Sequence, residues 1–141
     1  MSSRVNHLSV FVSAIVFFLL SYVWYSFLFG KMYAASMPAG ASAMPASMTM
    51  PLIETFLLGW FLAYVIGTAL SMRPDPNPAT KGLGFGIFMG IGVYASMTLM
   101  GVVWGGLPFT VWAINAGFVV VAMAIMGWII GAWSARGSAT A

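Results

Sequence analysis

Apolar residues fall into four long runs, which short polar or proline-containing stretches separate. The runs cover approximately residues 8–29, 52–72, 82–104 and 111–133. Crossing the hydrocarbon core of a bilayer takes a helix of about 20 apolar residues, so each run is long enough to span. The short connections favour antiparallel neighbours. The pattern therefore predicts an all-α fold, an up-down bundle of four transmembrane helices that forms one integral membrane domain over residues 1–141.

One connection, residues 34–51, has a different composition from the rest of the chain. It consists almost entirely of Met, Pro, Ala, Ser, Gly and Thr. Its prolines at positions 38, 45 and 51 are incompatible with a continuous helix. The segment is predicted to be an irregular loop at the membrane surface. A cleaved signal peptide is the alternative for the first run, but that run is too long for a typical signal sequence.

The composition agrees with a lipid environment. The chain is 62% hydrophobic and 5% charged, whereas a soluble domain averages about a quarter charged residues. The few basic residues do not cluster, so no nucleic-acid partner is predicted. Arg4, Arg73, Lys81 and Arg136 fall on one side of the four spans, and Lys31 alone falls on the other. The excess of basic residues predicts that both termini are cytoplasmic.

Small residues recur at four-residue spacing in three of the runs. Such ridges let helix backbones approach closely in lipid, where packing holds helices together. We expect these faces to pack against other helices, either within the bundle, in a homo-oligomer or in other membrane subunits. The predicted packing residues are Gly59, Ala63, Gly67, Ser71, Gly82, Gly86, Gly90, Gly127 and Gly131.

Polar and aromatic residues are predicted to gather near the outer end of the bundle: Trp24, Tyr25, Ser26, Lys31, Glu54 and Asn115. Glu54 is the one carboxylate inside a run, and ionisable groups at membrane depth favour a functional role. It is a candidate for handling a proton or cation. The alternative is a surface carboxylate near a helix start that pairs with Lys31 or reaches the headgroups. Asn115 is expected to form an interhelical hydrogen bond.

Residues for other chemistry are scarce. The chain has no cysteine and one histidine, His7. Thiolate catalysis and Cys-based metal sites therefore lack their cysteine, and a Ser-His-Asp triad has a single candidate histidine. We expect no enzymatic activity, no catalytic residue and no cofactor; bound lipid or pigment between the helices is an open alternative that these residues do not indicate. Methionines of the predicted loop, at positions 37, 44, 48 and 50, are candidate soft ligands for Cu(I). Their alternative role is apolar filling.

Two segments resemble a known family. Trp24-Tyr25-Ser26, followed by residues 29–31 (Phe-Gly-Lys), resembles the "WYSP…FGK" signature of small bacterial membrane proteins grouped as DUF1761. Asn115-Ala116-Gly117 and residues 127–133 are similar to that family's last helix. Phe27 stands where the family often has proline, and the connection at 34–51 is unusually rich in Met, Pro and Ala. The resemblance implies a four-helix protein of the bacterial inner membrane and no assigned activity.

Three functions are compatible with these observations. The leading hypothesis is a non-enzymatic structural or accessory subunit that associates with other membrane proteins or with itself, because small-residue faces occur on three spans. The alternative is a small transporter or a proton- or cation-linked channel that uses Glu54. A second alternative is Cu(I) binding by Met37, Met44, Met48 and Met50 in the outer loop.

Overall fold

The structure is a computed structural model that describes residues 5–40, 47–73 and 75–139. The described residues form helices and connections and contain no strand. The elements are α1 (His7–Val23), η1 (Trp24–Leu28), α2 (Gly30–Ser36), α3 (Thr49–Met72), α4 (Pro78–Met89), η2 (Gly90–Ala95), α5 (Ser96–Val103) and α6 (Phe109–Ala139). The two η elements are single π-helical turns, in which a backbone N–H bonds to the carbonyl five residues earlier.

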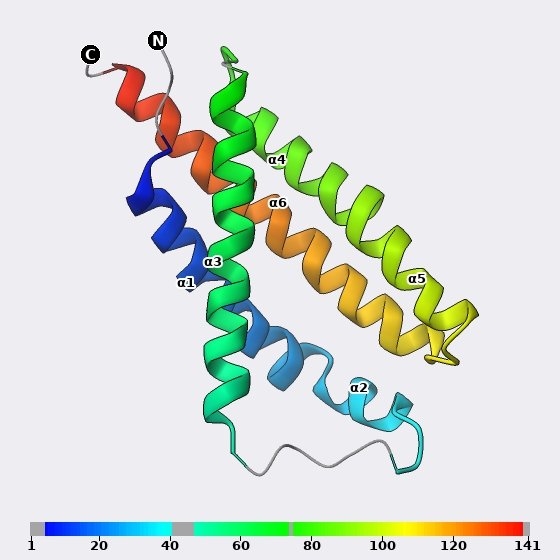
Figure 1. The fold of residues 1–141 in the computed structure, drawn as a ribbon. Coiled ribbons are helices and arrows are strands. Elements are labelled where there is room, and N and C mark those ends of the chain that lie inside the picture. Colours follow the sequence, from blue (N-terminus) through cyan, green and yellow to red (C-terminus); the bar gives the residue numbers. More distant parts are fainter. Residues whose placement is uncertain (1–4, 41–46, 74, 140–141) are drawn as a thin grey trace.

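These elements combine into four long helices. Helix α1 continues through η1, and α4, η2 and α5 follow one another as a single rod. The four helices long and apolar enough to cross a membrane are His7–Leu28, Thr49–Ser71, Pro78–Val103 and Phe109–Arg136. They alternate in direction, and both chain ends lie at the same end of the bundle (Figure 1). The all-α bundle of four long apolar helices is confirmed, while the cytoplasmic position of the termini stays a prediction.

Several helix boundaries differ from those expected. Helix α2 extends to Ser36, so the first residues of the expected loop are helical. Helix α3 begins at Thr49 and includes Pro51, because proline needs no hydrogen-bond partner for its nitrogen in the first helical turn. Helix α4 begins at Pro78 for the same reason. Helix α6 extends beyond both expected limits.

The most extensive contact between helices joins α4 to α6. A Cβ atom added at Gly82 would overlap the carbonyl group of Gly127, and one added at Gly127 would overlap that of Gly82. Gly86 lies in the same way against the backbone of Met123, and a Cβ at Gly90 would lie 2.8 Å from Cα of Val120. The two backbones therefore touch along a line of glycines, which we call the glycine seam.

Helix α3 packs mainly on α1. Gly59 makes room for Phe17, whose Cδ1 would lie 2.6 Å from an added Cβ. Ala63 is fully buried, and a Cβ at Gly67 would lie 3.1 Å from Cγ1 of Val5. The small-residue ridge of α3 is thus used inside the chain.

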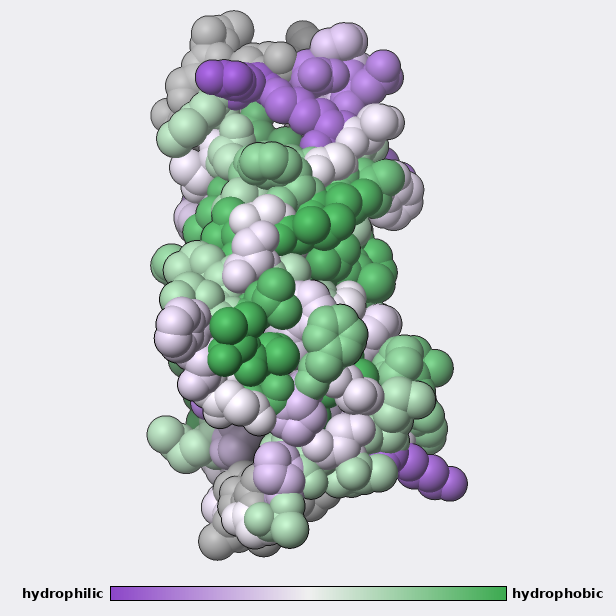
Figure 2. Space-filling view, turned by 90° about the vertical axis from the view of Figure 1, so that its right-hand side faces the viewer, coloured by the Kyte–Doolittle hydropathy of each residue, from purple (hydrophilic) through white to green (hydrophobic). Residues whose placement is uncertain are grey.

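The end of α3 and the start of α4 lie close together, and the two helices diverge toward the opposite end of the bundle (Figure 1). They are connected at the end of the bundle where the chain termini lie, which we call the basic end because Arg73, Lys81 and Arg136 are there. In the space-filling view, hydrophilic residues cover this end and apolar residues cover the middle (Figure 2). At the opposite end, which we call the aromatic end, α3 lies apart from α5.

The glycine seam gives a testable prediction. Gly86→Ala should lower the free energy of unfolding by about 1–3 kcal/mol, because overpacking forces the backbones apart. Gly84→Ala is the matched control, since nothing lies within 4 Å of its added Cβ and alanine favours a helix by up to about 1 kcal/mol. Thermal unfolding followed by circular dichroism in one detergent would compare them. Equal stabilities of the two variants would contradict the seam.

Candidate functional site

The segment Trp24-Tyr25-Ser26 lies at the end of the first long helix and contacts the start of α6. The indole Nε1–H of Trp24 donates a hydrogen bond to the backbone carbonyl of Ile114 at 3.2 Å. The Trp24 ring also lies over Gly117, where an added Cβ would be 3.4 Å from Cζ2 of the indole. Glycine at position 117 therefore lets the indole lie against the α6 backbone.

Tyr25 forms the second link. Its hydroxyl donates to Oδ1 of Asn115 over 2.7 Å, a direct side-chain bond between two spans. Asn115 thus has the interhelical partner expected of it. Gly30, just beyond η1, has its Cα against the backbone carbonyl of Tyr25, so any side chain there would collide with it. The two segments of the family resemblance are therefore joined in space, and we call these contacts the Trp24–Tyr25 clamp.

The clamp surrounds Phe118, which is 5% exposed. The ring of Phe118 lies 5.1 Å from that of Phe17, 5.4 Å from that of Tyr25 and 6.1 Å from that of Trp24, all in tilted arrangements. Such tilted contacts are favourable because the positive edge of one ring meets the negative face of another. Phe118 thus fixes α1 and η1 against α6 at this level of the bundle.

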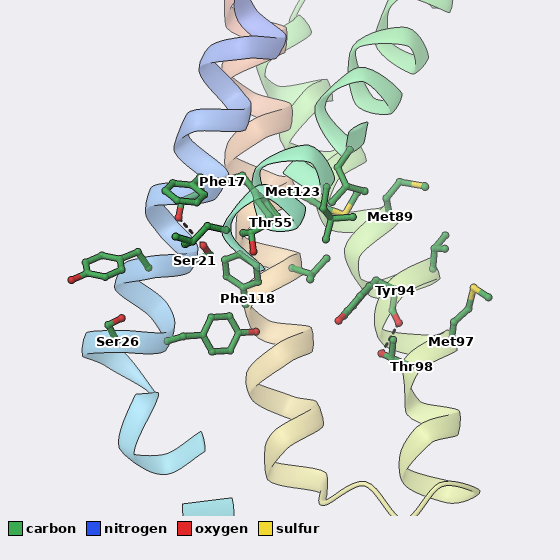
Figure 3. A pocket seen from close by; sticks show the side chains of 18 of the residues that line it. Phe17, Ser21, Ser26, Thr55, Met89, Tyr94, Met97, Thr98, Phe118 and Met123 are labelled. Atoms are coloured by element: carbon green, nitrogen blue, oxygen red, sulfur yellow. Dashed lines mark hydrogen bonds between the residues drawn. The ribbon is translucent and has the colours of Figure 1, made fainter. Parts of the chain in front are cut away.

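A cavity of about 690 Å³ opens beside Phe118, between α1 with η1, α3, α4 through α5, and α6 (Figure 3). Its floor is the buried group Phe17, Phe118, Val119 and Met123. Its rim is formed by exposed side chains on three of the long helices and by Met48, which precedes α3: Tyr22, Met48, Leu52, Leu58, Val93 and Met97. The cavity therefore opens sideways, through the side of the bundle where α3 and α5 diverge.

Hydroxyl groups are the main polar side chains of the cavity wall. They belong to Ser21, Tyr22, Tyr25, Ser26, Thr55, Tyr94 and Thr98. Among the described residues, no Asp, Glu, Lys, Arg or His lines the cavity. A wall with this chemistry can hold an apolar molecule and orient it through one or two hydrogen bonds.

Both π-helical turns border the cavity. Tyr25 lies in η1, and Tyr94 lies in η2 on the opposite wall. The extra residue of each turn rotates the side chains that follow it relative to an uninterrupted α-helix, and π turns often mark functional sites. The η2 turn is held to α6 by Trp112, whose Nε1–H donates to the carbonyl of Ala95 at 3.2 Å and to Oγ1 of Thr98 at 3.1 Å.

The other residues expected in the polar outer cluster are dispersed. Ser26 lies on the exposed rim of the cavity. Glu54 is exposed on α3, Lys31 is exposed on α2, and neither lines the cavity. The structure forms no ion pair between Lys31 and Glu54. The structure therefore brings together Trp24, Tyr25 and Asn115, but not Glu54 with Lys31.

The methionines and the remaining packing residues lie in several places. Met37 ends α2, Met48 precedes α3 and lines the cavity, and Met50 is 72% exposed in the first turn of α3. Met44 lies outside the described residues, as does Arg4. Gly131 contacts the backbone of Pro78, and the Ser71 hydroxyl donates to the carbonyl of Thr68.

Sequence reasoning missed the residues that shape the cavity, above all Tyr94 and Phe118. One usable signal was present: Ser21 and Tyr25, and also Tyr94 and Thr98, are four residues apart within apolar spans. Side chains at this spacing share one face of a helix. Two such hydroxyl pairs on separate spans indicate polar faces turned toward a common space.

The clamp gives the second prediction. Tyr25→Phe and Asn115→Ala should each lower stability by about 0.6–2 kcal/mol, the range for interhelical hydrogen bonds in membranes. Because both variants remove the same bond, the double variant should lose less than the sum of the two. Unfolding of the four proteins in one detergent would measure this coupling, with Tyr22→Phe as a hydroxyl control outside the clamp, because the Tyr22 ring packs on Phe27 instead. Strictly additive losses would argue against the bond.

The comparisons with known proteins identify a family and nothing beyond it. No curated protein and no solved structure matches the chain. One family model, described as "Protein of unknown function (DUF1761)", matches residues 8–131. This match contains both segments of the clamp, the second and third long helices in full, and the first and fourth except for His7 and residues 132–136. The chain therefore belongs to the DUF1761 family of proteins of unknown function.

Proposed function

We propose that this protein is a non-enzymatic integral membrane protein that binds a small apolar molecule in the cavity beside Phe118. The observation that carries this proposal is the cavity itself, of about 690 Å³. Binding sites for small molecules typically have volumes of about 300–1,000 Å³ and apolar walls with a few polar groups. The bundle provides such a site within its apolar middle and near its aromatic end.

The construction of the walls supports binding. The floor residues Phe17 and Phe118 are held by the aromatic contacts around the clamp, so the inner surface is preformed. The rim residues Tyr22 and Met97 are 59% and 68% exposed, so an apolar molecule could enter directly from the lipid. The lining hydroxyls have no carboxylate, amine or imidazole beside them in the described cavity wall, and nothing there indicates catalysis.

The packing argument for an accessory subunit loses its main support. That hypothesis relied on small-residue faces free for other proteins, but Gly59, Gly86 and Gly127 contact neighbouring helices of the same chain. Partner subunits, a homo-oligomer and a location in a bacterial inner membrane all stay predictions. Transport through Glu54 and Cu(I) binding by the methionines also gain no support from the geometry.

Filling the cavity tests the proposal. Val93 lies on the rim, and Val93→Trp should occupy the cavity and exclude its ligand. Val103→Trp is the matched control, because Val103 is 69% exposed and lies outside the cavity lining. Each protein would be extracted gently from its membrane, and its bound small molecules would be measured by mass spectrometry after solvent extraction.

The expected result is one molecular species bound in near-stoichiometric amount to the wild-type protein and to Val103→Trp, and lost from Val93→Trp. Retention of that species by Val93→Trp would contradict the proposed site. A wild-type protein that carries only bulk lipid, in bulk proportions, would contradict the proposed function.

A further inference from the structure

Most hydroxyl protons in the deep part of the cavity are already used within the chain. The hydroxyl of Ser21 donates to the carbonyl of Phe18 at 2.7 Å. Thr55 donates to the carbonyl of Pro51 at 2.8 Å. A hydroxyl has a single proton, so neither side chain is available as a donor to a bound molecule.

The same holds for Thr98 and Tyr25. Thr98 donates to the carbonyl of Tyr94 at 2.7 Å and accepts from Trp112. Tyr25 donates to Asn115. Their roles are therefore structural, and they hold the walls in place.

Tyr94 is different. It is half-buried in the cavity wall, and its side chain points into the cavity (Figure 3). Among the described residues its hydroxyl has no hydrogen-bond partner. A tyrosine hydroxyl can donate one proton, so this group is free to donate a hydrogen bond to an acceptor atom on a bound molecule. The two remaining lining hydroxyls, on Tyr22 and Ser26, are on the exposed rim.

Two further properties limit the occupant. The described lining contains no charged side chain, and an unpaired ion is strongly disfavoured in such surroundings, so the part that enters the cavity is neutral. Aromatic side chains from three long helices line the space, among them Phe17, Tyr94 and Phe118. Aromatic walls favour a flat ring, which they can contact by stacking or by their edges.

We propose that the cavity binds a neutral lipid with a carbonyl-bearing ring, of the chemical class of the prenyl quinones, and that the hydroxyl of Tyr94 donates a hydrogen bond to the ring carbonyl. This inference rests on the proposed function and specifies its ligand. The ring lies between Tyr94 and Phe118, and the apolar tail leaves through the opening between α3 and α5. The proposal concerns binding alone and includes no redox step.

The test compares two probes that share a ring and a ten-carbon tail. Decylubiquinone has ring carbonyls, and decylbenzene has none. Binding of each probe to the purified, delipidated protein would be measured by native mass spectrometry over a range of probe concentrations. The variants are Tyr94→Phe, which removes the donor and keeps the ring, and Tyr33→Phe as the control, because Tyr33 does not line the cavity. Circular dichroism would verify that both variants keep the helical fold.

We expect decylubiquinone to bind the wild-type protein with one molecule per chain, and Tyr94→Phe to weaken this binding by about threefold to tenfold, the effect of one hydrogen bond. Decylbenzene should bind more weakly than decylubiquinone and be unaffected by Tyr94→Phe. Tyr33→Phe should bind both probes like the wild type.

Other outcomes would separate the two proposals. Equal affinity for the two probes, or an unchanged affinity of Tyr94→Phe for decylubiquinone, would overturn the ligand class while leaving an apolar binding site in place. A loss of both probes in Tyr94→Phe would overturn the donor role, because the effect would then concern the cavity shape. If neither probe binds the wild-type protein, and the wild type also carries no extracted species that Val93→Trp loses, both the inference and the proposed function are overturned.

Discussion

The close contact of α4 with α6 determines the arrangement of the other helices. Gly82 and Gly127 leave no space for side chains between the two backbones, and close approach of this kind is a main source of helix association in lipid. Helix α3 packs mainly on α1 and less extensively on α6. The rod of α4, η2 and α5 and the helix α3 then diverge toward the aromatic end (Figure 1), and the cavity lies between them.

The segments that resemble the family signature have a common structural role. Trp24 and Tyr25 attach the end of the first long helix to α6 through bonds to Ile114 and Asn115, and Gly30 lets the chain turn directly against Tyr25. None of these contacts is catalytic in character. They hold Phe118 and the inner wall of the cavity in a fixed position. The signature residues therefore support the cavity, whose own lining is mostly apolar.

The sequence was sufficient to predict the fold, but it was insufficient to predict the cavity and its lining residues. Run length predicts the four spans, and the four-residue spacing of Gly82 and Gly86 indicates a contact face. The sequence does not show that this face meets α6, because any helix with a small-residue ridge could take that place. The π turns were also missed, since residues 90–95 have the composition of an ordinary span. Glu54 lies near the start of α3, but a position along a helix does not determine which face of the bundle a residue occupies.

If the cavity binds a lipid-soluble molecule as proposed, its sideways opening determines which concentration of that molecule sets the occupancy. A molecule that enters from the bilayer never has to cross water, so its supply depends on its mole fraction among the lipids and not on its aqueous concentration. Tyr22 and Met97 both line this opening, so a ligand that enters there from a bilayer would compete with lipid acyl chains for the same space. Occupancy would then vary with the lipid composition of the membrane, and two membranes with the same amount of ligand per cell volume could fill the site to different extents.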